Sequence, residues 1–272
     1  MCGRYAVTTD PAKLAAEIDA VNEVPPPEPA ADLDAPDTGT ADAQLTLDGA
    51  PADDPKPRPA FPNYNVAPTT TIMTVVARHS HDHPDDDPTM RIRAMRWGLV
   101  PSWAKEIGKG SLFNARAESV GEKASFRGSV KSKRCLIPMD GWYEWRKVEV
   151  PGSSKPAKVP YYMSPRDGTR LFMAGLWSVW RPRNAGPDAA PLLSATILTT
   201  DSVGPLTDIH DRMPLIMPFE EWDAWLTPDA PAPPELFDAP ALALAEAIDI
   251  REVSPLVNRV SNNGPELLTP AG

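Results

Sequence analysis

The pattern of apolar and polar residues along this chain is mainly that of β-strands. Residues 71–78 (TIMTVVAR) and 90–97 (MRIRAMRW) alternate or run through β-branched residues, and the polar segment between them predicts a hairpin. Residues 170–177 (RLFMAGLW) and 193–200 (LSATILTT) also predict strands. Strand-rich segments with helical patterns toward the ends indicate an α+β fold.

Three segments predict helices. Residues 10–18 (DPAKLAAEI) begin with an aspartate suited to the N-cap, followed by a proline suited to the first helical position. Residues 219–226 (FEEWDAWL) place aromatic side chains on one helical face. Residues 235–248 predict a helix that is interrupted near Pro240, because proline removes a helical hydrogen bond.

Proline-rich polar segments interrupt this pattern. Residues 22–60 hold nine prolines and almost no large apolar side chains, so they predict a disordered acidic insertion rich in Pro, Ala and Asp. Shorter loop insertions are expected at about 79–89 and 148–160. Motif-like segments flank all three insertions, and we therefore expect residues 1–272 to form a single domain.

Composition narrows the class of protein. The chain has 272 residues, 42% of them hydrophobic, with neither an apolar run of membrane-spanning length nor a secretory signal. The two cysteines predict no disulfide framework, so we expect a cytoplasmic protein, and Cys135, in apolar surroundings, is interpreted as an inert core thiol. We expect no cofactor and no metal, although His79, His81 and His83 lie in one short acidic tract.

The net charge of −10 is unevenly distributed. Residues 91–147 hold 13 Lys and Arg against 5 Asp and Glu, a net charge of +8, whereas residues 19–59 carry a net charge of −8. A basic face of this kind is compatible with binding a nucleic-acid backbone, and equally with an ordinary solvated surface.

The second residue of the chain is a candidate nucleophile. If Met1 is removed, Cys2 carries a free α-amine beside its thiol, with ordinary pKa values of roughly 8 and about 8.5. An aldehyde condenses with such an amine to an imine, and the neighbouring thiol can close a five-membered thiazolidine. A cysteine at position 2 without a special role is the alternative.

Several motifs recur in order along nearly the whole chain outside the insertions: NYNVAPT (63–69), RWGLVPSWAK (96–105), FNARAES (113–119), RCLIPMDGWYEW (134–145), ILTTD (197–201), IHDRMPLIM (209–217) and VSPLVNRVS (253–261). Together they resemble the SRAP family of abasic-site processing proteins. The resemblance implies a curved, mostly antiparallel β-sheet or open barrel with flanking helices. It also implies removal of Met1, binding of single-stranded DNA, and covalent capture of the ring-opened abasic-site aldehyde by Cys2.

By the same resemblance, the active-site positions are Cys2, Asn114, Glu144 and His210. Glu144 lies among aromatic residues that should raise its pKa and suit it to proton transfer, and His210 titrates near neutrality. Each is also compatible with a structural role. For DNA contacts we predict Arg4, Arg116 and Arg212 on phosphates, Trp97 and Trp103 stacked on bases or packed in the core, and Pro68 at the floor of the pocket.

Two other functions fit parts of this pattern. Class II glutamine amidotransferases also begin with Met-Cys-Gly and use the terminal cysteine as nucleophile, but they need an internal Asn-Gly motif, and here Asn263-Gly264 lies near the C-terminus. A non-catalytic reader of single-stranded DNA would bind without forming a covalent product. No protein-partner motif is recognisable, and we expect a monomer.

Overall fold

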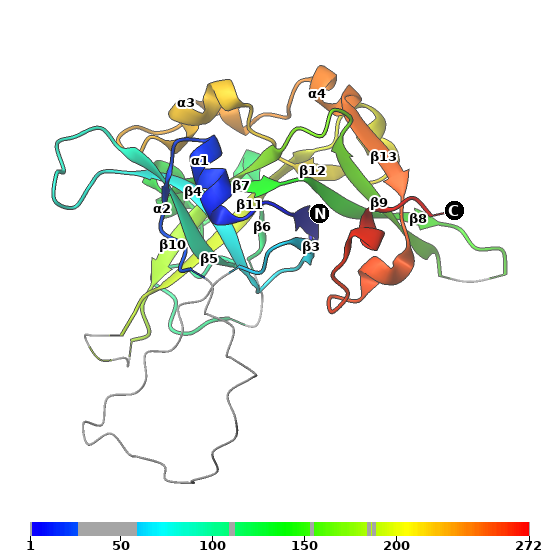
Figure 1. Ribbon diagram of the computed structural model, residues 1–272, viewed down its shortest axis with the longest axis horizontal. Coiled ribbons are helices and arrows are strands. Elements are labelled where there is room, and N and C mark those ends of the chain that lie inside the picture. Colours follow the sequence, from blue (N-terminus) through cyan, green and yellow to red (C-terminus); the bar gives the residue numbers. More distant parts are fainter. Residues whose placement is uncertain are drawn as a thin grey trace, which may run out of the picture.

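The computed structural model describes residues 2–26, 59–108, 112–152, 155–183, 186 and 189–271. Most of the acidic insertion predicted at residues 22–60 lies outside the described residues. Two groups of strands stand side by side in Figure 1, one toward the left and one toward the right. No helix among the described residues is long and apolar enough to cross a membrane.

A closed five-stranded barrel forms the larger group. Its strands are β4 (Thr71–Arg78), β5 (Thr89–Trp97), β7 (Arg134–Met139), β10 (Leu171–Trp180) and β11 (Leu192–Asp201). The neighbours β5–β4–β7–β10–β11 are antiparallel, and a parallel pairing of β11 with β5 closes the ring through Ser194↔Arg96 and Ala195↔Trp97. The α+β class and the predicted hairpin are confirmed, and the sheet expected as an open barrel is closed by this one parallel pair.

Apolar side chains of the barrel strands make the core. Each strand contributes residues that are essentially inaccessible to solvent, among them Val75, Ile92, Leu136, Met173 and Ile197. Strands buried on both sides explain why β7 (RCLIPM) and β10 read as continuous apolar runs and not as alternating ones.

The second sheet has the order β13–β9–β8–β1–β3. Its strands are β13 (Ile248–Glu252), β9 (Ala157–Pro165), β8 (Gly141–Val148), β1 (Tyr5–Val7) and β3 (Asn63–Val66). β1 is antiparallel to both of its neighbours, β8 and β3, so the amino-terminal residues lie between segments far away in sequence. Since β9 begins at Ala157, the last residues of the insertion expected at 148–160 are strand, whereas residues 79–88 do connect β4 to β5 without regular structure.

Three short strands extend the barrel: β2 (Val21–Asn22) on β5, and β6 (Asn114–Arg116) and β12 (Arg212–Pro214) on β11. β6 runs parallel to β11 through Ile197↔Asn114, and β12 runs antiparallel to it through Asp201↔Arg212. Asn114 and the segment just before Arg212 are thus both fixed by β11.

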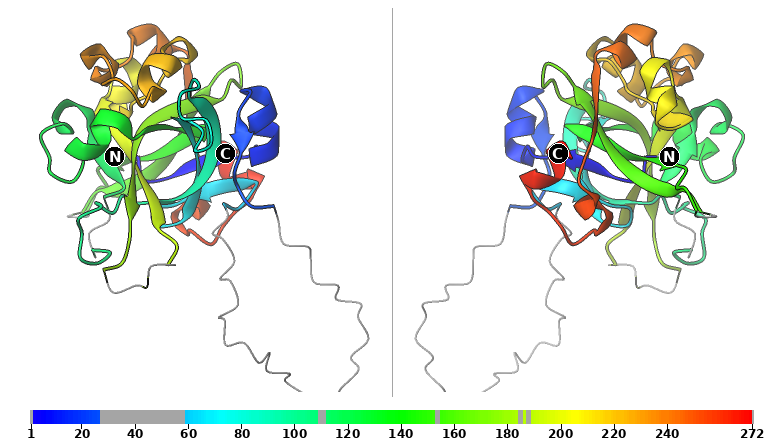
Figure 2. Two further views of the ribbon diagram at one scale, coloured as in Figure 1. Left: turned by 90° about the vertical axis from the view of Figure 1, so that its left-hand side faces the viewer. Right: turned by 90° about the vertical axis from the view of Figure 1, so that its right-hand side faces the viewer.

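The helices are short and lie outside the strands. The α-helices are α1 (Pro11–Glu17), α2 (Arg127–Ser132), α3 (Trp222–Leu226) and α4 (Leu242–Glu246). The 3₁₀ helices are η1 (Ala117–Ser119), η2 (Gly204–Asp208), η3 (Phe219–Glu221), η4 (Pro234–Phe237), η5 (Pro255–Asn258) and η6 (Pro265–Leu268). Asp10 caps α1 as predicted, its carboxylate accepting hydrogen bonds from the backbone N–H groups of Ala12 and Lys13. Figure 2 shows α1 and the α3–α4 region on different sides of the sheets.

Candidate functional site

Cys2 lies fully buried just before β1. Its backbone carbonyl accepts a hydrogen bond of 2.7 Å from Nδ2 of Asn114. Burial raises the pKa of the Cys2 thiol far above its ordinary range, and the negative charge of Glu144 acts in the same direction. The thiol therefore stays protonated until a partner removes its proton.

Glu144 lies on β8, the strand that pairs with β1. Its side chain is 3% exposed, and burial raises the pKa of its carboxyl from the ordinary 4.5 to about 7, against the positive charge of the amino terminus. The aromatic neighbours are held separately: the Tyr143 hydroxyl donates to the carbonyl of Tyr64, and Nε1 of Trp145 donates to Oδ1 of Asn258. At neutral pH, Glu144 is present in both protonation states, as an acid–base group requires.

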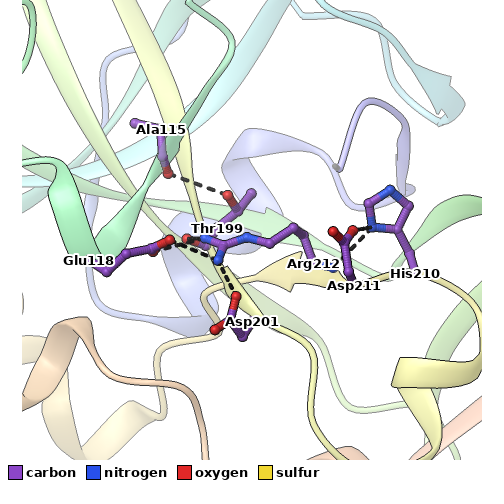
Figure 3. A network of polar contacts seen from close by, with 7 residues as sticks. All are labelled: Ala115, Glu118, Thr199, Asp201, His210, Asp211 and Arg212. Carbon is purple, nitrogen blue, oxygen red and sulfur yellow. Dashed lines mark hydrogen bonds and ion pairs between the residues drawn. The ribbon is translucent and has the colours of Figure 1, made fainter.

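His210 stands at the end of the segment that leads into β12 (Figure 3). Its Nδ1 accepts a hydrogen bond of 2.9 Å from the backbone N–H of Arg212, whereas the carboxylate of Asp211, 2.8 Å from the same atom, needs Nδ1 protonated. Both cannot hold at once. Burial lowers the pKa of His210 and Asp211 is largely exposed, so we assign the neutral ring with its proton on Nε2.

Arg212 ties this segment to the barrel, as Figure 3 shows. Its Nη atoms donate to both carboxylate oxygens of Glu118, each at 2.9 Å, and to Oδ1 of Asp201 and the carbonyl of Thr199. The residue is 7% exposed. Both Nη atoms of Arg212 are already engaged by protein groups, and the phosphate contact of this residue stays a prediction; its backbone N–H donates to Nδ1 of His210.

A cavity of about 560 Å³ joins these elements. Residues Gly3, Arg4, Phe113, Glu144, Trp145, Lys147, Lys158, His210 and Asn258 line it. The structure therefore brings Glu144 and His210 into one cavity beside Gly3. Cys2 directly precedes Gly3 in the chain, and Asn114 is hydrogen-bonded to the carbonyl of Cys2. Lys147 and Lys158 were missed by the sequence reasoning, although the excess of basic residues in 91–147 was a signal for the first of them.

The other residues predicted to contact DNA differ in their exposure and in their position relative to the cavity. Arg4 lines the cavity, but its Nη1 already donates to Oδ1 of Asn65 and to the carbonyl of Val257. Arg116 is exposed at the end of β6. Pro68 is half-buried in the turn after β3 and is not among the described residues that line the cavity.

The two tryptophans differ most. Trp97 is 0% exposed, with Tyr5 and Phe113 packed edge-on against its ring and Nε1 bonded to the carbonyl of Phe113. It is a core residue, so base stacking is wrong for Trp97. Trp103 is 59% exposed and lines a second cavity of about 220 Å³, so its stacking on bases stays a prediction.

Two features outside the site are structural. Cys135 is fully buried on β7, and burial raises the pKa of its thiol. His79 is bonded to Asp229 and to the carbonyl of Asp86. Within the described ranges, no group of three or more metal-ligating side chains converges.

Comparisons with known proteins identify relatives of this chain. YoqW of Bacillus subtilis, an abasic site processing protein, is 37% identical over 208 residues, which cover 76% of this chain and 85% of that protein. HMCES of Rattus norvegicus, also an abasic site processing protein, is 34% identical over 239 residues, covering 77% of this chain and 65% of HMCES.

A crystal structure of a protein from Bacteroides thetaiotaomicron has the same fold, with a TM-score of 0.68 at 23% identity over 99% of this chain and 100% of that one. The family model described as SOS response associated peptidase (SRAP) matches residues 1–260. The resemblance read from the sequence motifs is therefore confirmed, and the chain belongs to the SRAP family.

Proposed function

We propose that this protein captures abasic sites in single-stranded DNA as a covalent thiazolidine on Cys2, and so shields them. The observation that carries the proposal is the placement of Cys2, fully buried and held through its carbonyl by Asn114, next to a cavity that contains Glu144 and His210. The abasic site processing proteins among its relatives support the choice of substrate.

The reaction needs no group from outside the site. Hydrolysis of the Met1–Cys2 peptide bond, which we assign to the protein itself, consumes one water and frees the α-amine of Cys2. That amine adds to the aldehyde carbon of the opened sugar, and the carbinolamine loses water to give an imine. The nitrogen keeps its proton in that step, and the thiol sulfur then bonds to the same carbon while the thiol proton passes to a base, which closes the thiazolidine. The sum is aminothiol plus aldehyde giving thiazolidine plus one water.

Glu144 is suited to both proton transfers. In its acid form it protonates the carbinolamine hydroxyl that leaves as water, and the resulting carboxylate accepts the proton of the buried thiol. A pKa of about 7 lets one group perform both steps near neutral pH. Neutral His210 presents Nε2–H, which donates to the sugar ring oxygen as the hemiacetal opens.

Intact mass spectrometry tests the proposal. The purified protein is weighed alone and after mixing with single-stranded DNA that carries one abasic site. We expect loss of Met1, then an adduct equal to the two masses less one water, formed without a reductant and resistant to borohydride because no imine persists.

The matched control is Cys2→Ala, which should form no adduct while it keeps salt-sensitive DNA binding. Tight binding without an adduct in the unaltered protein would refute covalent capture and favour a non-catalytic DNA reader. Hydrolysis of glutamine would favour an amidotransferase.

A further inference from the structure

Two lysines face each other across the hairpin that carries Glu144. Lys147 on β8 is the register partner of Lys158 on β9, and both side chains are exposed and line the cavity of the candidate site. Directly opposed residues on antiparallel strands have Cβ atoms about 4.5–5.5 Å apart, and like charges at that spacing are destabilising. Folding gains nothing from this pair of charges.

Their charge is not balanced by neighbouring protein groups. Within the part of the chain that the structure describes, no carboxylate forms an ion pair with either lysine. The arginines at the site differ, because Arg4 is engaged by Asn65 and Val257, and Arg212 by Glu118 and Asp201. Among the described residues that line the cavity, the two lysines are thus exposed cations available to an external anion.

The field of this pair reaches the reacting groups. Lys147 and His210 line the same cavity, and the positive charge of Lys147 adds to the effect of burial, which lowers the pKa of His210. A sugar that enters the cavity to meet Cys2 brings its own phosphates, because an abasic nucleotide has lost only its base.

We propose that Lys147 and Lys158 together bind one phosphate of the DNA strand flanking the abasic sugar and so hold that sugar in the cavity. The inference rests on the proposed function and adds a phosphate site to it. Two ammonium groups on neighbouring strands can each donate hydrogen bonds to one phosphate, whose charge also relieves their mutual repulsion.

The test uses the double variant Lys147→Gln/Lys158→Gln and a control, Lys13→Gln/Lys131→Gln, which removes the same charge from exposed positions on α1 and α2. Binding is measured from low to high salt with single-stranded DNA that carries a tetrahydrofuran residue, which lacks the aldehyde. We expect the slope of log affinity against log salt to fall by ~0.7 in the site variant relative to the control, as for one lost phosphate contact.

A second probe locates the contact. A neutral methylphosphonate placed on one side of the tetrahydrofuran residue should weaken binding of the unaltered protein as much as the lysine changes do, and should weaken the site variant no further. Equal salt slopes for the site variant and the control, or additive losses with methylphosphonates on either side, would overturn the inference.

Two more readouts keep the outcomes distinct. The melting temperature of the site variant should equal or exceed that of the unaltered protein, since a repulsion has been removed; a decrease would assign the lysines a structural role and overturn the inference. If the unaltered protein forms the abasic adduct and the salt slopes are equal, the phosphate site is wrong and the proposed function stands. If no adduct forms, the proposed function fails, whatever the slopes.

Discussion

Replacing Glu144 by glutamine should stabilise the protein and disable it at the same time. A carboxyl whose pKa is raised on folding contributes stability at pH values below its unfolded pKa, and that contribution is lost as the pH rises through the folded pKa. With values of 4.5 unfolded and about 7 folded, Glu144 costs less than about 1 kcal/mol at pH 5 and about 3 kcal/mol at pH 8, relative to a side chain that does not titrate. Glutamine keeps the shape of the side chain and removes this cost.

Urea unfolding of both proteins at pH 5 and pH 8 measures the effect. We expect the advantage of Glu144→Gln to grow by about 2–3 kcal/mol between the two pH values, equivalent to a gain in melting temperature of about 5–10 °C. Crosslinking by the variant should be slow throughout this range. An equal difference in stability at both pH values would refute the reasoning, because it would mean that Glu144 titrates as an exposed carboxyl does.

Three further predictions follow from the contacts. Asn114→Ala removes the hydrogen bond to the Cys2 carbonyl and should slow adduct formation about 10-fold, equivalent to ~1.4 kcal/mol, in single-turnover assays; an unchanged rate would contradict a positioning role. Trp103→Ala should weaken binding of single-stranded DNA by ~1–3 kcal/mol without changing the melting temperature, whereas Trp97→Ala should cost ~3–5 kcal/mol in urea unfolding. Arg212→Lys should lower stability by ~1.5–3 kcal/mol and leave the salt slope of DNA binding unchanged; a smaller slope with normal stability would return Arg212 to the phosphates.

The strands of the barrel could be predicted because local composition determines them. β4, β5, β10 and β11 are rich in β-branched and apolar residues, and their observed bounds lie within three residues of those predicted. The parallel pairing of β11 with β5 could not be predicted, since it joins Ser194 to Arg96 and no local pattern records a contact between segments so far apart.

The candidate site, too, could be predicted only in part. The position of Glu144 among aromatic residues indicated a buried carboxyl, and the structure has one. The roles of Trp97 and Arg212 could not be read from their motifs, because burial and ion pairing depend on strands from elsewhere in the chain. The lysine pair was missed because Lys158 becomes the neighbour of Lys147 only through the register of β8 and β9.

Arg4, which lies between Cys2 and β1, is held by hydrogen bonds that involve residues 257–262. Arg4 donates to the carbonyl of Val257, 253 residues later, and its second partner, Asn65, donates to the carbonyls of Arg259 and Asn262. During synthesis, the nascent chain therefore carries its amine and thiol long before the groups that would align them exist. The contacts that hold the amino terminus in the site therefore form only after residues 257–262 have been synthesised, and until then Cys2 has the ordinary reactivity of an unfolded cysteine.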